Sequence, residues 1–150
     1  IISTPFTTLE DMPIQPRGAA GTVGTVTVKQ RYAAGLADLE GFSHIYLLYR
    51  FHRATRVELT VVPFMDTVKR GVFATRSPLR PNHLGLSLVE LTGVEGAVLT
   101  VRGIDVLDGT PLLDIKPYIA SFDQVVESRS GWMQSDGTEI AATRSDSRFV

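Results

Sequence analysis

The chain has 150 residues, a single-domain length, and a net charge of −1 at pH 7. Hydrophobic residues make up 43% and charged residues 21%, which is ordinary for a globular protein in water. A net charge this close to zero disfavours a protein coated in positive charge for nonspecific nucleic-acid binding. The lack of cysteine excludes disulfides, thiolate nucleophiles and zinc–cysteine sites. No stretch approaches the roughly 20 apolar residues of a membrane span, and the first residues lack the pattern of a signal peptide. We therefore expect a cytoplasmic protein outside any membrane.

Most of the sequence predicts strands joined by short turns. Apolar and polar residues alternate, as expected for half-buried strands, over residues 25–29, 44–52, 57–62, 72–75, 84–94, 97–107 and 112–115. Gly93, Glu95 and Gly96 supply the turn chemistry for a hairpin between the two strands that they separate. Many short strands punctuated by Gly and Pro favour a β-barrel or a β-sandwich.

Two regions depart from this strand pattern. Apolar residues at helical spacing predict a helical turn over residues 34–42. From about residue 127 the chain becomes polar, and Trp132 and Met133 are its main apolar anchors. We therefore expect one domain over residues 1–126, with residues 127–150 as an extension packed on it.

The stretch over residues 70–87 holds a dense polar cluster, which consists of Arg76, Ser77, Pro78, Arg80, Pro81 and Asn82. The two prolines fix φ, remove backbone donors and push the preceding residues toward extended geometry. The loop should therefore be stiff and should hold its two guanidinium groups in defined directions. Such loops commonly carry function. The alternative is a proline-stiffened connection whose arginines face water.

Charges are segregated along the chain despite the balanced total. Lys69, Arg70, Arg76 and Arg80 have no acid between them, whereas Asp105, Asp108 and Asp114 form an acidic group downstream. If both groups bordered one pocket, the pocket could bind a zwitterion; the alternative is that solvated loops carry their charges independently. Asp105 interrupts an apolar run, where a buried carboxylate needs a partner. Asp108 can accept a ligand hydroxyl or cap its own turn.

The spacing of the three histidines does not suit a shared metal ion. His44 and His52 are eight residues apart on one face of a predicted strand, roughly 26 Å at about 3.3 Å per residue. His52 ends that strand beside Arg53, where its ring could meet a ligand, whereas His44 fits a structural role and His83 belongs to the proline loop. We expect no metal site.

Residues 12–16 form a second proline-bracketed stretch, in which Pro13 and Pro16 flank Gln15. The amide of Gln15 could pair with an adenine-like edge, or it could simply face solvent. Neither GxGxxG nor GxxxxGK is present, and nothing resembles a nucleophile elbow.

Five motifs carry a resemblance to a known family: STPF, MPIQP, LEGFSHIYLLYRFH, GVFATRSPLRPN followed by GLS, and DVLDGTPLLDIKPYI. Over roughly residues 2–119 the chain resembles the TsaA-like family of S-adenosylmethionine-dependent methyltransferases, of the YaeB or TrmO type. The resemblance implies a mainly β fold, a small β-barrel with short helical segments. It implies a homodimer with S-adenosylmethionine near the subunit contact. The implied reaction is N6-methylation of threonylcarbamoyladenosine next to the anticodon of tRNA.

The resemblance also implies which residues contact the cofactor: Pro13, Ile14, Gln15, His52, Arg53, Arg76, Leu86, Gly103, Ile104, Asp105 and Val106. In this assignment Arg76 pairs with the cofactor carboxylate, and Asp105 holds its ammonium or a ribose hydroxyl. The adenine would lie among Leu86, Ile104 and Val106. Candidate substrate contacts are Arg70, Arg80, Asn82, Asp108 and Lys116.

The sequence departs from the family pattern at two motifs. The proline–arginine–glutamine motif here reads Pro13–Ile14–Gln15, and the asparagine–proline–isoleucine–glycine motif reads Asn82–His83–Leu84–Gly85. In this family bacterial members carry a further C-terminal domain, and we expect this protein to be without one. Three functions therefore stay open: a tRNA methyltransferase, a methyltransferase with a small-molecule acceptor, and a non-catalytic module that senses the cofactor or binds RNA.

Overall fold

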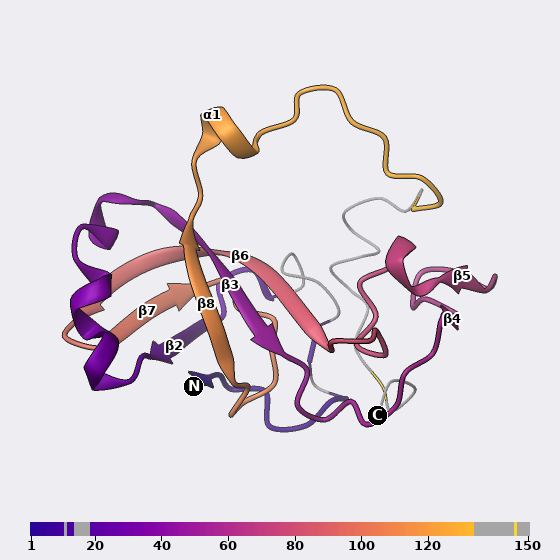
Figure 1. The fold of residues 1–150 in the computed structure, drawn as a ribbon, viewed down its shortest axis with the longest axis horizontal. Helices are drawn as coiled ribbons and strands as arrows, with labels where there is room; N and C mark the ends of the chain where they lie inside the picture. The colour runs from indigo at the N-terminus through magenta and orange to yellow at the C-terminus, as the bar shows by residue number, and fades with distance from the viewer. Residues whose placement is uncertain (11, 14–18, 134–145, 147–150) are drawn as a thin grey trace.

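The computed structural model describes residues 1–10, 12–13, 19–133 and 146. Ile14 and Gln15 of the predicted cofactor set therefore lie outside the described residues. Figure 1 shows a curved sheet on one side and a small lobe on the other, with the lobe (residues 54–83) containing the strands β4 and β5.

The main sheet has six strands in the order β1-β2-β7-β6-β3-β8, and every neighbouring pair is antiparallel. Its strands are β1 (Ile2–Ser3), β2 (Val23–Thr27), β7 (Val98–Arg102), β6 (Leu84–Glu95), β3 (His44–Arg50) and β8 (Leu112–Pro117). The long strand β6 pairs with β3 through its first half and with β7 through its second. The predicted hairpin is present, with Glu95 opposite Val98.

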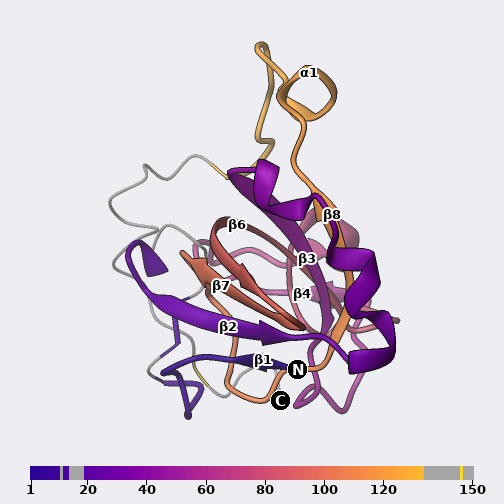
Figure 2. The ribbon, with the colours of Figure 1, turned by 90° about the vertical axis from the view of Figure 1, so that its left-hand side faces the viewer.

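The mainly β prediction is confirmed, but the sheet does not close into a barrel through a continuous ladder. Its two edges, β1 and β8, meet only at an isolated bridge between Ile2 and Thr110, two residues before β8 begins. There the Ile2 amide donates to the Thr110 carbonyl at 2.9 Å, and the Gly109 amide donates to the Ile2 carbonyl at 3.0 Å. Figure 2 shows the curvature that brings these edges toward each other. Strand β1 has only two residues, so it offers too little backbone for a ladder.

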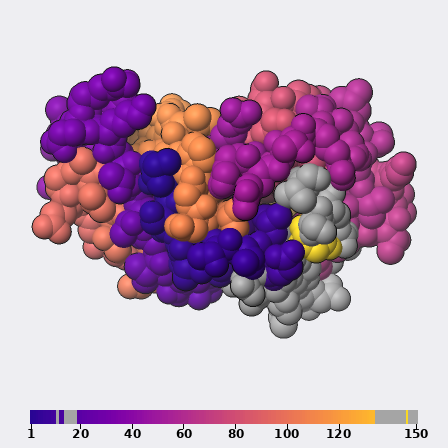
Figure 3. Space-filling view, turned by 90° about the horizontal axis from the view of Figure 1, so that it is seen from below, coloured from indigo at the N-terminus to yellow at the C-terminus, as the bar shows by residue number. Residues whose placement is uncertain are grey.

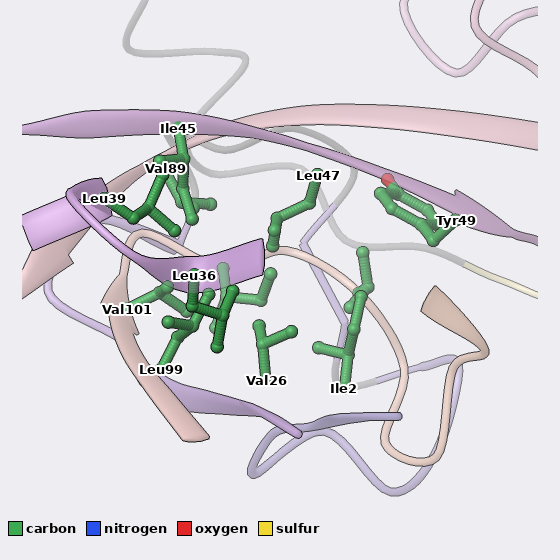
Figure 4. Close-up of a cluster of buried hydrophobic side chains, with 12 residues drawn as sticks. Ile2, Val26, Leu36, Leu39, Ile45, Leu47, Tyr49, Val89, Leu99 and Val101 are labelled. Atoms are coloured by element: carbon green, nitrogen blue, oxygen red, sulfur yellow. The ribbon is translucent and has the colours of Figure 1, made fainter. Parts of the chain in front are cut away.

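The core lies on the concave face of this sheet. On β3 the alternation buries Ile45, Leu47 and Tyr49, and these pack against residues such as Val26 and Leu99 from β2 and β7 (Figure 4). One end is covered by two 3₁₀ helices, η2 (Gln30–Leu36) and η3 (Leu39–Gly41). The predicted helical region is thus in place, but it forms two 3₁₀ turns, because Asp38 adopts a left-handed φ of 65° between them.

The lobe has a much smaller core of Ala54, Val61 and Leu79. It contains β4 (Thr60–Val61), β5 (Arg70–Gly71) and the 3₁₀ helix η4 (Val72–Ala74). The predicted strand over residues 72–75 is wrong, because only Val72 of η4 is buried and the chain turns there. The predicted strand over residues 57–62 shortens to β4.

After β8 and the single-turn helix α1 (Ala120–Asp123), the chain runs back from the sheet to the lobe (Figure 1). Trp132 reaches the lobe, where its indole Nε1 donates a hydrogen bond to the Ala74 carbonyl at 2.8 Å. The division at residue 126 stays a prediction, since much of the later segment lies outside the described residues. Across the described ranges, no helix is long and apolar enough to cross a membrane.

Candidate cofactor and substrate cleft

A cleft of about 1140 Å³ lies between the sheet and the lobe. Its sheet side comes from the end of β3, the start of β6 and the turn at Asp105–Leu107. Its lobe side comes from the loop around Arg76 and from Phe64 and Phe73. Pro13 from the N-terminal segment and Trp132 also line it. Figure 3 shows the indigo N-terminal residues running across one face toward the magenta lobe, so residues 1–10 adjoin both parts.

A chain of hydrogen bonds fixes the sheet side. The Tyr49 hydroxyl lies 2.9 Å from Ser87 Oγ, and Ser87 Oγ donates to Asp105 Oδ1 at 2.6 Å. Because Ser87 has one hydroxyl proton and gives it to the carboxylate, Tyr49 must donate to Ser87. The partner that Asp105 needs in an apolar run is therefore Ser87, from a strand distant in sequence. The chain holds one carboxylate oxygen in a fixed direction.

Gly85 makes room for this arrangement. It lies directly opposite Tyr49 in the β3–β6 ladder, and a Cβ at Gly85 would come within 2.1 Å of Tyr49 Cε2. A side chain there cannot coexist with the tyrosine ring in its present place. The glycine thus allows the Tyr49 ring to lie against the strand and present its hydroxyl to Ser87.

The charges of this cluster are set by burial and by Arg76. Burial raises the pKa of Asp105 to about 6, an increase limited by the Ser87 hydrogen bond and by the Arg76 charge. Burial, together with the nearby Asp105 charge, raises the pKa of Tyr49. At pH 7 and above, the cleft therefore holds an ionised Asp105 within the electrostatic reach of Arg76, beside a protonated Tyr49.

On the lobe side, internal hydrogen bonds stiffen the proline loop. Arg80 Nη1 donates to the Thr75 carbonyl at 3.0 Å, which closes the turn around Arg76. His83 has a left-handed φ of 50°, and its Nδ1 lies 2.8 Å from the Pro78 carbonyl oxygen. The loop is therefore rigid, as its prolines predict, and Arg76 is its exposed guanidinium at the cleft.

Most of the described residues in the predicted cofactor set line the cleft: Pro13, His52, Arg53, Arg76, Leu86, Asp105 and Val106. Gly103 and Ile104 do not. Ile104 is fully buried in the core behind the cleft, and Gly103 forms the turn after β7 with a φ of 82°. The assignment of Ile104 to the adenine stays a prediction; after the left-handed turn at Gly103, its side chain lies in the core.

The predicted substrate contacts do not gather at one place. Arg80 lines the cleft. Arg70 lies outside the cleft lining and forms an ion pair with Asp66 at 2.7 Å. Asp108 Oδ1 accepts the Thr4 amide at 3.0 Å, so it fastens the N-terminal segment. Lys116 pairs with Asp114 at 3.5 Å on β8, and Asn82 lies outside the cleft lining.

Several residues of the site escaped the sequence analysis, above all Tyr49, Ser87, Phe73 and Trp132: all but Ser87 line the cleft, and Ser87 is buried and donates to Asp105. A signal for the first two was present: Gly85 and Ser87 are small residues at alternate positions of an otherwise leucine-rich strand. Such a gap on the buried face marks a place where a large ring from another strand fits.

His52 joins the same cleft. Burial, and then the Arg53 charge, lower its pKa, so its ring is neutral at pH 7. Its Nδ1 lies 3.5 Å from Thr110 Oγ1. Among the described residues no three His, Asp or Glu side chains gather as metal ligands.

The cleft therefore combines a fixed carboxylate, an exposed guanidinium and apolar walls at Leu86 and Val106. This set suits a ligand that carries both charges and a flat apolar ring, because each charge finds an opposite partner and the ring leaves water.

Comparisons with known proteins agree with this description. Residues 1–124 match the family model described as the tRNA-methyltransferase O N-terminal domain. The chain is 48% identical over 149 residues to a probable S-adenosyl-L-methionine-binding protein of Pyrococcus abyssi, covering 99% of this chain and 81% of that protein. It is 47% identical over 91 residues to a tRNA (adenine(37)-N6)-methyltransferase of Mus musculus, covering 59% of this chain and 21% of that enzyme. The crystal structure of TrmO from Pseudomonas aeruginosa matches with a TM-score of 0.73 at 39% identity, covering 87% of this chain and 58% of that chain. This chain belongs to the family of the tRNA-methyltransferase O N-terminal domain.

Proposed function

We propose that this protein is an S-adenosylmethionine-dependent tRNA methyltransferase that methylates N6 of threonylcarbamoyladenosine next to the anticodon. The family match over residues 1–124 carries the proposal. The names of its relatives, which include tRNA (adenine(37)-N6)-methyltransferases and S-adenosyl-L-methionine-binding proteins, support it. The presence of the oppositely charged Arg76 and Asp105 in one cleft gives it a physical basis.

S-adenosylmethionine fits the chemistry of the cleft. Arg76 would pair with the carboxylate of its methionine part, and Asp105 would accept from its ammonium or from a ribose hydroxyl. Leu86 and Val106 would border the adenine. When bound, the cofactor supplies a sulfonium methyl group that an acceptor nitrogen attacks in line.

The protein's own contribution to the reaction is alignment. Asp105 is held by Ser87, and the Arg76 loop is held by Arg80, so both binding groups are in place before a ligand arrives. Positioning of this kind can lower a barrier by roughly 7–11 kcal/mol, since the entropy of bringing two reactants together is paid on binding.

Two measurements test the proposed function. Isothermal titration calorimetry should detect binding of S-adenosylmethionine and S-adenosylhomocysteine to the purified chain. Mass spectrometry of tRNA nucleosides should show that the methylated adenosine disappears from cells that lack the protein and returns when the gene is restored. A chain that binds neither ligand, or an unchanged nucleoside profile, would count against the proposed function.

A second candidate is a protein that binds the same cofactor without modifying tRNA, either with a small-molecule acceptor or without catalysis. It is favoured by relatives in three archaea that are named only as S-adenosyl-L-methionine-binding. Methyl transfer from labelled cofactor decides between the candidates: label in tRNA supports the first, and label in a small molecule or none supports the second.

We also propose that the active form is a homodimer, as the family resemblance implies. The outer face of β6 and β8 exposes Leu86, Leu88 and Leu113, each more than a third accessible. Leu86 also lines the cleft, so a second copy seated here would lie beside the cofactor. Light scattering should report a dimer, and Leu88→Glu should yield a monomer. A monomeric wild-type protein would contradict this proposal.

A further inference from the structure

Two large aromatic side chains on the lobe side of the cleft are not used by the cofactor assignment. Phe73, on η4, is 75% exposed, and Trp132 joins it in the cleft lining. Neither belongs to the main core or to the lobe core. Phe73 is exposed and Trp132 is half-buried, and apolar rings that stay accessible beside a binding cleft mark an interaction site more often than a packing role.

The Trp132 ring is held in position although it lies outside both cores. Its Nε1 donates to the Ala74 carbonyl at 2.8 Å, next to Phe73 in the chain. The Arg70 guanidinium carbon lies 5.7 Å from the ring centroid, within the range of a cation–π contact. Arg70 Nε in turn donates to Asp66 Oδ2 at 2.7 Å. Three successive contacts thus orient an aromatic surface at the rim of the cleft.

The cleft is larger than a site for one small molecule usually is. Its volume of about 1140 Å³ exceeds the roughly 300–1,000 Å³ typical of a site for one small molecule. The aromatic residues lie on the lobe side, whereas Asp105 lies on the sheet side. Arg53 and Arg80 also line the cleft, and they add positive charge to it. A flat ring attached to an anionic backbone complements this combination.

We propose that Phe73 and Trp132 form a stacking surface for a nucleobase of an RNA strand, while Arg53 and Arg80 favour its phosphates. Bases splayed out of an RNA loop are commonly recognised by stacking on aromatic side chains. The proposal rests on the proposed function, since it places the acceptor strand opposite the cofactor. It assigns the aromatic rings to the substrate and leaves cofactor affinity to Asp105 and Arg76.

Trp132 is the one tryptophan of the chain, so its fluorescence reports on this surface alone. Unfractionated tRNA, added with S-adenosylhomocysteine present, should quench the emission. Inorganic polyphosphate, which has charge but no bases, should leave it unchanged. Equal responses to both probes would show that stacking is absent and would overturn the proposal.

Substitutions separate this surface from the cofactor site. Phe73→Ala and Trp132→Ala should each weaken binding of labelled tRNA, measured by fluorescence anisotropy, by about 5- to 150-fold, the range expected for loss of one base–aromatic stack. Neither should change the dissociation constant of S-adenosylhomocysteine by more than about twofold. Phe122→Ala is the matched control, because Phe122 is 79% exposed but lies outside the cleft lining.

The outcomes distinguish the two proposals. A wild-type chain that binds no S-adenosylhomocysteine overturns the proposed function. If the wild type binds this ligand, and Phe73→Ala and Trp132→Ala bind tRNA as tightly as the wild type does, only the stacking surface is overturned. Because both rings lie outside the two cores, melting temperatures close to that of the wild type should accompany the loss of tRNA affinity.

Discussion

The two sides of the cleft are built in different ways. On the sheet side, Tyr49 and Ser87 belong to paired strands over a large core, and they hold Asp105 through successive hydrogen bonds. On the lobe side, the loop that carries Arg76 rests on a core of only three buried residues and is stiffened by prolines and local hydrogen bonds. The difference teaches that a fixed carboxylate needs the ladder and core around it, whereas an exposed cation needs only a rigid turn.

Replacing one core leucine by alanine in each part should give the largest difference in stability between the sheet and the lobe. Leu47 is fully buried in the main core, so Leu47→Ala should lower the free energy of unfolding by about 2–5 kcal/mol. Leu79→Ala should loosen the lobe first, because Leu79 and its backbone partner Glu58 lie there. Hydrogen exchange should then show faster exchange confined to the lobe. If hydrogen exchange in Leu79→Ala became faster throughout the chain, the lobe would not unfold separately from the sheet.

Asp105→Asn should stabilise the free protein while it weakens cofactor binding. The pKa of Asp105 is raised to about 6 from 3.8, so the folded state binds its proton more tightly than the unfolded state. The unfolding free energy of the wild type should therefore fall as the pH rises from about 4 to about 6. The Asn variant should lack this decline and gain up to about 3 kcal/mol at pH 7.

Denaturant titrations at pH 4 to 8 measure this effect. Asp114→Asn, an exposed carboxylate on β8, is the control and should keep the wild-type pH dependence. If Asp105→Asn were no more stable than the wild type at pH 7, the ionised Asp105 carboxylate would not destabilise the folded protein.

Arg76→Ala should weaken S-adenosylmethionine binding by roughly 1.5–3 kcal/mol, the scale of a charged hydrogen bond, with little change in stability. Arg76 is exposed at the cleft, so few packing contacts are lost. Calorimetry provides the measurement, and Arg31→Ala, on η2 outside the cleft lining, should bind like the wild type. Equal dissociation constants for Arg76→Ala and the wild type would make Arg76 a structural residue.

Gly85→Ala should destabilise the protein by about 1–3 kcal/mol, because its Cβ would overlap the Tyr49 ring. The matched control is Gly93→Ala on the same strand, where a Cβ would lie at an ordinary 3.8 Å from Thr100. Thermal melts compare the two variants. Similar melting temperatures would mean that the Tyr49 ring can move aside without loss.

Local pattern was sufficient for most of the sheet. The alternation of apolar and polar residues predicted the strands β3 and β6. The glycines before β7 predicted the hairpin that joins β6 to β7. It failed at residues 72–75, where alternation over four residues is too short to separate a strand from a 3₁₀ turn. The family resemblance, and not local pattern, named Ile104 as a cofactor contact; that assignment stays a prediction, because a motif records adjacency along the chain and not which face a side chain takes, and the Ile104 side chain lies in the core.

By itself the sequence determined the strand-rich architecture, the stiff arginine loop and the need of Asp105 for a partner, since all three follow from short-range chemistry. Only the tertiary structure decided that the partner is Ser87, that Gly85 accommodates Tyr49, and that Trp132 returns to the lobe. These contacts join residues 18 to 58 positions apart. Such contacts depend on strand register and on the path of the chain, which local patterns do not encode.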